Sequence, residues 1–378
     1  MNAMKKKISF LLALIMIMSL IPMSASAAGG DKLVAITFDD GPSKYTSTLL
    51  DGLAKRDAKC TFFIVGQNAA NYSSTVKRAW EEGHEIASHT YDHADLNTLS
   101  SSAITSTLSK TDAALDKALG FDLKYNLRPP YGNANSSVLN TVGTPCFYWS
   151  VDTRDWESRN ADSVYNNIMK YTKDGSIVLL HDIYSTAVDG VLRAIDSLKA
   201  KGYEFVTVSE LFYRRGITLQ SGVMYYSAYP GSKGTADGIK DPVISVKDTE
   251  NGKQVTISGD SRGSVYYTTN GKIPTPDNSK KYTGEFYIDA KSTICAVSAI
   301  NWNGLRSDTV SQYIDYSPAA TPVFSHSGDE LSISCSTSGA KIYYTTDGSA
   351  PTEKSTRYTG PFTAGKGTTY KACAFAKG

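Results

Sequence analysis

Cysteine is scarce in this chain of 378 residues, which contains five at widely separated positions and no C-x-x-C pair. This spacing excludes a disulfide framework and a thiolate metal or redox motif. Because the number is odd, at least one thiol stays unpaired within the chain. We expect Cys60 and Cys146, which adjoin apolar runs, to be buried free thiols. A bridge in the C-terminal half of the chain is the alternative.

The chain also lacks an excess of charge of either sign. It contains 39 Lys and Arg against 37 Asp and Glu, a formal net charge of +2, and no run of Lys or Arg follows the first few residues. This balance gives no support to a surface that follows phosphates, so we expect no nucleic-acid partner. A neutral ligand fits the composition better.

Long apolar runs are absent except for one at the N-terminus. Three lysines at 5–7 precede an apolar run over 8–23, which is followed by Ala25-Ser26-Ala27. This layout is typical of a secretory signal peptide, here residues 1–28. An uncleaved membrane anchor is the alternative, although the run is slightly shorter than the ~20 residues that a spanning helix needs. Either way, we expect the remaining chain to work outside the cytoplasm. With the signal peptide, the expected location is secreted, extracellular or associated with the cell wall.

Between residues 32 and about 216, short apolar runs alternate with longer amphipathic segments. The runs, typical of strands, span 33–38, 61–65, 85–87, a short stretch ending at Leu127, 147–151, 177–180 and 205–208. The amphipathic segments, typical of helices, span 68–82, 101–119, 161–172 and 187–200. This alternation predicts an α/β fold with a parallel sheet. So many strands in so short a stretch favour closure into a barrel.

Reactive polar residues follow five of the predicted strands. They are Asp39 and Asp40 after the first, His89 after the third, Arg128 after the fourth, Asp152 and Asp155 after the fifth, and His181 after the sixth. Barrels carry their chemistry at the carboxyl ends of their strands. We therefore expect one site, within a catalytic domain at 29–216.

The composition changes after Gly216, where a turn-rich linker is expected at 217–240. The stretch 265–275 is then repeated at 342–352, with Tyr-Tyr-Thr-Thr followed by Asn-Gly or Asp-Gly. Alternating Tyr, Thr and Val broken by such turns indicate antiparallel strands. We predict two small all-β sandwich modules, at 241–316 and 317–378.

His89 and His93 lie four residues apart, so on one helical turn both imidazoles would face a single ion. A solvated or capping pair is the alternative. The adjacent carboxylates Asp39 and Asp40 favour a metal, because burying two like charges is costly and a divalent cation removes that cost. Asp40 and the two histidines would leave open positions for water. Asp39 would lie beside that water, with a turn or helix N-cap role as the alternative.

Arg128 precedes Pro129-Pro130-Tyr131-Gly132. The prolines fix an extended backbone and leave the Tyr131 N–H free to point at a ligand. A buried arginine needs a carboxylate, for which Asp39 is the candidate. An arginine on the surface near a proline-rich turn is the alternative.

His181 directly follows the apolar run 177–180. With Asp155 available to hold its far nitrogen, His181 is a candidate proton donor. The alternative is a core histidine whose nitrogens are satisfied structurally. Trp156, beside Asp155, is a candidate wall of the site.

Together these segments resemble the polysaccharide deacetylase family, also called the NodB-homology domain or carbohydrate esterase family four. Five motifs carry the resemblance in the family's order: Thr-Phe-Asp-Asp-Gly-Pro at 37–42, Ser-His-Thr-Tyr-Asp-His at 88–93, Arg-Pro-Pro-Tyr-Gly at 128–132, Asp-Thr-Arg-Asp-Trp at 152–156 and Leu-Leu-His at 179–181. They extend across roughly residues 32–216, and none departs from the family pattern.

The resemblance implies a distorted (β/α) barrel and a role for each motif residue. Asp39 would be the general base that deprotonates the attacking water, and Arg128 would orient it. Asp40, His89 and His93 would be the ligands of a divalent cation, expected to be Zn²⁺ with Co²⁺ as the alternative.

The remaining motif residues would act on the substrate. The Tyr131 N–H and the cation would stabilise the tetrahedral oxyanion, and His181 would protonate the departing amine. Asp155 would tune His181. Leu179 and Trp156 would form the pocket for the acetyl methyl group.

The activity implied is hydrolysis of N-acetyl groups on N-acetylglucosamine units. We expect the protein to be a monomer. For an exported chain the expected polymer is peptidoglycan, with chitin next. An O-acetyl esterase acting on xylan is the alternative reaction, because the same groups would serve an ester. A catalytically idle glycan-binding protein is the alternative of another class.

The tail repeats resemble the chitobiase/β-hexosaminidase C-terminal domain, which implies either carbohydrate binding or spacing. The second repeat stops before the counterpart of 301–313 in the first. Its last strand is therefore expected to be missing or supplied from elsewhere.

Overall fold

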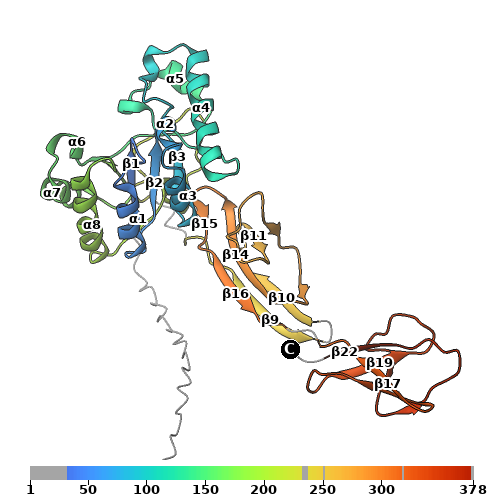
Figure 1. Ribbon diagram of the computed structural model, residues 1–378. Coiled ribbons are helices and arrows are strands. Elements are labelled where there is room, and N and C mark those ends of the chain that lie inside the picture. The colour runs from blue at the N-terminus through green and yellow to red at the C-terminus, as the bar shows by residue number, and fades with distance from the viewer. Residues whose placement is uncertain (1–31, 232–236, 250–251, 317–318, 376–378) are drawn as a thin grey trace, which may run out of the picture. The chain divides into compact units, whose positions relative to one another are not determined.

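A computed structural model describes residues 32–231, 237–249, 252–316 and 319–375 (Figure 1). The predicted signal peptide at 1–28 lies outside the described residues. Within the described residues, no helix has the length and apolar character needed to cross a membrane. All five cysteines are free, and Cys60 and Cys146 are buried as predicted.

The N-terminal half is built on a parallel sheet whose strands follow the order β3-β2-β1-β6-β5, with β7 also paired to β1. The strands are β1 (Lys32–Asp39), β2 (Cys60–Ile64), β3 (Glu85–Ser88), β5 (Val151–Asp152), β6 (Ser176–His181) and β7 (Tyr203–Phe205). Every residue of β1 after Lys32 is buried. A strand covered on both faces explains why its sequence reads as a continuous apolar run.

Pairing continues beyond β3 through short contacts. Leu127 bridges to Ser88 on one side and to Cys146 on the other, and β4 (Cys146–Phe147) pairs in parallel with β8 (Met224–Tyr225). A bridge between Ser227 and Ser176 then returns to β6. The strands therefore follow one another around a distorted barrel, which confirms the predicted fold class.

Two sequence predictions differ from the structure at this edge of the barrel. The run 147–151, predicted as one strand, is two short strands, β4 and β5, separated by 148–150. The segment 217–240, predicted as a linker, contains β8, so part of it belongs to the parallel sheet.

Helices connect the strands and cover the outer face of the sheet (Figure 1). They are α1 (Thr46–Ala54), α2 (Gly66–Ala69), α3 (Ser73–Glu81), α4 (Ser101–Leu119), α5 (Ser136–Val142), α6 (Asp155–Ser158), α7 (Ala161–Tyr171), α8 (Ser185–Lys199) and α9 (Val208–Arg214), with 3₁₀ turns η1 (Leu96–Thr98) and η2 (Pro130–Gly132). The longest, α4, begins where the Ser100 hydroxyl accepts a hydrogen bond from the Ala103 N–H, and it ends at Gly120 with φ +88°.

Alternate side chains of β1 face the core under the helices and the barrel interior that contains the site. Val34, Ile36 and Phe38 pack under the helices, whereas Leu33 and Ala35 pack in the barrel interior. Because successive side chains of a strand point to opposite faces, Thr37 and Asp39 also face the interior, at its carboxyl end. The interior is therefore apolar at one end and polar at the other.

The C-terminal part consists of antiparallel sheets, as predicted. Its first repeat contains β9 (Val243–Thr249), β10 (Gly252–Ser258), β11 (Ser264–Thr268), β12 (Lys280–Lys281), β13 (Phe286–Ile288), β14 (Ser292–Asn301), β15 (Leu305–Arg306) and β16 (Val310–Ile314). Its second contains β17 (Val323–Ser327), β18 (Glu330–Ser334), β19 (Lys341–Thr345), β20 (Thr356–Arg357), β21 (Phe362–Thr363) and β22 (Lys371–Phe375). Each repeat forms two sheets, which fits a small sandwich.

The turn between β14 and β15 is bonded to the backbone of β3. The amide of Asn303 accepts a hydrogen bond from the Ile86 N–H at 3.0 Å and donates to the Ile86 carbonyl at 2.7 Å and the Lys124 carbonyl at 3.0 Å. Asn303 is only 3% exposed. A side chain from the first repeat thus satisfies polar groups of the strand that leads to His89.

We predict that Asn303→Ala lowers the free energy of unfolding by about 2 to 4 kcal/mol, because buried N–H and C=O groups of β3 lose their partners. The melting temperature of the full chain measures this change. Asn71→Ala, at an exposed position, is the matched control and should have little effect. Equal melting temperatures for the two variants would contradict the bonding role of Asn303.

Candidate active site

The residues predicted for the site lie at one end of the barrel. Asp39, the last residue of β1, is in register with His181 at the end of β6. His89 follows β3, and Arg128 follows the bridge at Leu127. Because parallel strands end at the same edge, segments far apart in the sequence meet there.

Asp39 and Arg128 form a buried ion pair, as the sequence predicted. Nη1 of Arg128 donates to Oδ1 of Asp39 at 2.6 Å, and the two side chains are 0% and 4% exposed. The same nitrogen also donates to the Thr37 hydroxyl at 2.8 Å. Burial raises the pKa of Asp39, while the charges of Arg128 and His181 act in the opposite direction. The carboxylate is thus held in one orientation with a raised proton affinity.

Asp40, His89 and His93 form the second group, and their ligand atoms all lie within 4.8 Å of one another. Nε2 of His93 lies 3.2 Å from Oδ1 of Asp40, and Nε2 of His89 lies 3.5 Å from it. That oxygen is buried and has no hydrogen-bond partner among the described residues. A buried carboxylate oxygen facing two imidazole nitrogens is a suitable donor set for a divalent cation.

The backbone that carries the two histidines is a loop, so the prediction of a single helical turn was wrong. Thr90 and His93 have φ values of +63° and +60°, in the left-handed region, and Asp40 has +69°. Non-glycine residues rarely adopt this conformation, and they do so mainly at functional sites. With this backbone, both His89 and His93 bring Nε2 to within 3.5 Å of the Asp40 carboxylate.

The protonation state of His89 suits a ligand. Its Nδ1–H donates to the Arg128 carbonyl at 2.7 Å, which leaves Nε2 directed at Asp40. Burial lowers the pKa of His89 to about 3. The imidazole is therefore neutral at physiological pH, as metal binding requires.

His181 and Asp155 form a pair on the other side of Asp40. The Nδ1–H of His181 donates to Oδ1 of Asp155 at 2.9 Å, and the His181 N–H donates to Oδ2 at 2.7 Å. Nε2 lies 4.0 Å from Oδ2 of Asp40. Burial alone would lower the pKa of His181, but the hydrogen bond and charge of Asp155 raise it to about 9. His181 therefore carries a proton on Nε2 at neutral pH.

The remaining predicted residues surround this centre. Tyr131 has a left-handed backbone, its side chain is 66% exposed, and its ring lies 4.7 Å from that of His93. Leu179, two positions before His181 on β6, shares its face of the strand. Trp156 is 46% exposed, and its backbone N–H donates to Oδ1 of Asp155 at 2.9 Å.

Comparison with known proteins assigns the chain. The sequence model for polysaccharide deacetylase matches residues 26–144, and that for the chitobiase/beta-hexosaminidase C-terminal domain matches 247–311 and 323–378. A peptidoglycan-N-acetylglucosamine deacetylase of Bacillus cereus is 37% identical over 187 residues, covering 47% of this chain and 68% of that protein. The chain belongs to the polysaccharide deacetylase family.

Two further relatives support the assignment of this chain to the deacetylase family. A peptidoglycan-N-acetylglucosamine deacetylase of Listeria monocytogenes is 40% identical over 197 residues, 52% of this chain. The chain spans only 41% of that relative's length. The solved structure of a T48 deacetylase with substrate superposes with a TM-score of 0.50 at 38% identity, covering 52% of this chain and 96% of that one.

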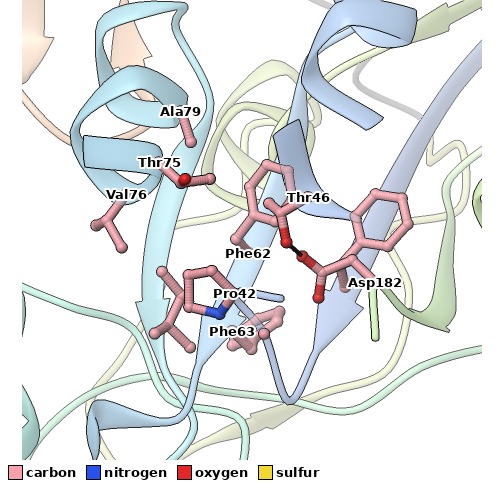
Figure 2. Close-up of a pocket in the computed structure, with 11 residues that line it drawn as sticks. Pro42, Thr46, Phe62, Phe63, Thr75, Val76, Ala79 and Asp182 are labelled. Carbon is pink, nitrogen blue, oxygen red and sulfur yellow. Dashed lines mark hydrogen bonds between the residues drawn. The ribbon is translucent and has the colours of Figure 1, made fainter. Parts of the chain in front are cut away.

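The sequence analysis did not single out Asp182, a buried acidic residue that lies beside Gly41 of the first motif. Figure 2 shows its carboxyl beside Thr46, whose hydroxyl donates to Oδ2 at 2.5 Å. The other oxygen, Oδ1, is buried without a hydrogen-bond partner among the described residues. A Cβ on Gly41 would lie 2.2 Å from it, so only glycine fits there. The available signal was an acidic residue directly after His181, still at the end of a buried strand.

Burial raises the pKa of Asp182 from its ordinary value of 3.8 to about 7. Between these values the folded chain keeps a proton that the unfolded chain releases. The contribution of Asp182 to the free energy of unfolding therefore falls as pH rises through this window, by up to about 1.4 kcal/mol per pH unit. Above pH 7 the contribution is constant.

We predict that the difference in melting temperature between the unaltered chain and Asp182→Asn declines from pH 4 to 7 and then levels off. Thermal unfolding with a chelator present measures this difference without a cation near Asp40. Asp289→Asn, at an exposed position, serves as the control and should show no such trend. A pH-independent difference for Asp182→Asn would show that this carboxyl is already ionised in the folded chain.

Proposed function

We propose that this chain is a secreted, metal-dependent deacetylase that hydrolyses the N-acetyl groups of N-acetylglucosamine units in peptidoglycan. The observation that carries the proposal is the convergence of three groups at one end of the barrel. These are the Arg128–Asp39 pair, the ligand set of Asp40 with two histidines, and the His181–Asp155 pair. Residues 1–28, with the layout of a signal peptide, support export.

Asp40, His89 and His93 would hold the cation, proposed to be Zn²⁺ with Co²⁺ as the alternative. The unpartnered oxygen of Asp40 and the neutral imidazole of His89 support this assignment. Such a cation, when bound, polarises a carbonyl oxygen and makes water a nucleophile at neutral pH.

Asp39 is the proposed general base. Arg128 holds Oδ1, so Oδ2 is left to accept the proton of the attacking water. Burial raises the pKa of Asp39 and strengthens it as a base, while the charge of Arg128 acts against this shift. The position at the end of β1 places it one residue from the ligand Asp40.

His181 is the proposed general acid. Asp155 holds Nδ1, so Nε2 is the nitrogen that can donate a proton to the departing amine. Its pKa of about 9 keeps it protonated at neutral pH. The Tyr131 N–H is the proposed donor to the oxyanion, and Leu179 with Trp156 is the proposed acetyl pocket.

The relatives and the signal-peptide layout support peptidoglycan as the polymer and the N-acetyl amide as the bond that is cleaved. Relatives from Listeria monocytogenes and Bacillus cereus are named for peptidoglycan N-acetylglucosamine deacetylation. The base, acid and oxyanion donor would also serve an acetyl ester, so acetylxylan and chitin oligomers are the comparison substrates.

We predict that Asp39→Asn lowers acetate release from peptidoglycan by about 10² to 10⁴-fold, the contribution of a general base. Bound metal should be retained, because Asp39 is outside the ligand set. Asp40→Asn is the contrasting variant and should lose both metal and turnover. Acetate release and metal content per chain are the two measurements. Undiminished turnover in Asp39→Asn would remove Asp39 from the mechanism.

A further inference from the structure

We propose that Tyr148 and Tyr226 form an aromatic platform that binds a sugar ring of the glycan next to the ring being deacetylated. This inference rests on the proposed function, because it extends the same substrate beyond the reacting unit. The ligand class is a neutral pyranose within a linear glycan.

The two tyrosines lie at the same end of the barrel as the catalytic groups. Tyr148 directly follows β4, and Tyr226 directly follows β8, which pairs with β4 in parallel. The Tyr148 N–H donates to the Tyr225 carbonyl at 2.7 Å, which fixes the two segments together. Both tyrosines are therefore at carboxyl ends of strands, where Asp39 and His181 also lie.

Tyr148 is joined directly to the site. Nη2 of Arg128 donates to the Tyr148 carbonyl at 2.8 Å. The Tyr148 ring packs on Gly132, where an added Cβ would lie 2.0 Å from a carbon of that ring. Gly132 follows Tyr131, whose ring lies against His93. The Tyr148 ring thus lies beside the segment 131–132, which also carries the ring packed against the proposed ligand His93.

Tyr226 packs against Tyr148 and is exposed at the surface. Its ring centroid lies 5.0 Å from that of Tyr148, with 46° between the planes, and its side chain is 54% exposed. Trp149 stacks on Tyr148 at 3.8 Å and 11°, so the inner ring is held in place. Tyr226 therefore presents ring surface to solvent while resting on a fixed neighbour.

A sugar ring matches this surface chemically. The C–H groups on one face of a pyranose are weakly positive and apolar, and the face of an aromatic ring is negative and apolar. Stacking buries both without requiring charge. A binding site lined by aromatic side chains with polar groups at one end is the usual form of a small-ligand subsite.

The test compares N-acetylglucosamine monomer and its β-1,4-linked hexamer as substrates of the full chain. We expect Tyr226→Ala to raise KM for the hexamer about tenfold, the loss of one stacked ring, with kcat unchanged. KM for the monomer, which cannot occupy both positions at once, should not change. Tyr226→Phe keeps the ring and should behave as the unaltered chain. Tyr229→Ala, also at an exposed tyrosine, is the matched control.

An unchanged hexamer KM in Tyr226→Ala would overturn the platform. Equal losses for monomer and hexamer, or the same loss in Tyr226→Phe, would also overturn it. Failure of the proposed function is a separate result, in which the unaltered chain releases no acetate from any oligomer. In that event the platform is tested by calorimetric Kd values for the hexamer, measured for the unaltered chain and for Tyr226→Ala. A tenfold weaker Kd in Tyr226→Ala supports the platform, and an equal Kd overturns it.

Discussion

Arg128 is the residue through which the parts of the site are held together. Its guanidinium fixes Asp39, its carbonyl oxygen fixes His89, and its N–H bonds to the Ser88 carbonyl at the end of β3. The side chain is fully buried and also donates to the carbonyls of Phe147 and Tyr148. One residue thus orients the proposed base and a proposed ligand, and it bonds to the end of β3. A buried arginine is tolerated only because nearly every donor is satisfied.

The two adjacent carboxylates at the end of β1 repel each other, and the surrounding residues compensate their charges in different ways. Asp39 is compensated inside the protein by Arg128. Asp40 has no such partner and instead faces the imidazoles of His89 and His93, an arrangement that favours a cation. The two carboxylates both approach Nε2 of His89, at 3.7 Å from Asp39 and 3.5 Å from Asp40, but only Asp39 is paired with the arginine.

Much of this arrangement is predictable from the sequence. Buried parallel strands read as apolar runs, and reactive residues placed after them converge because parallel strands end together. Helices α1, α5 and α9 were missed because each has nine residues or fewer, too short for a clear helical period. The loop at 89–93 was misread because spacing alone does not distinguish a helical turn from left-handed backbone. The burial of Asp182 and the pairing of β8 with β4 depend on tertiary contacts, although the position of Asp182 directly after His181 was an available signal.

The central claim is that Asp40, His89 and His93 hold a cation beside Asp39. Anomalous diffraction at the zinc edge, from crystals of the full chain grown with Zn²⁺, tests it most directly. The account predicts one strong peak about 2.0 to 2.2 Å from the Asp40 carboxylate and from Nε2 of both histidines. No peak at this position, with the Asp40 carboxylate turned away from the imidazoles, would contradict it.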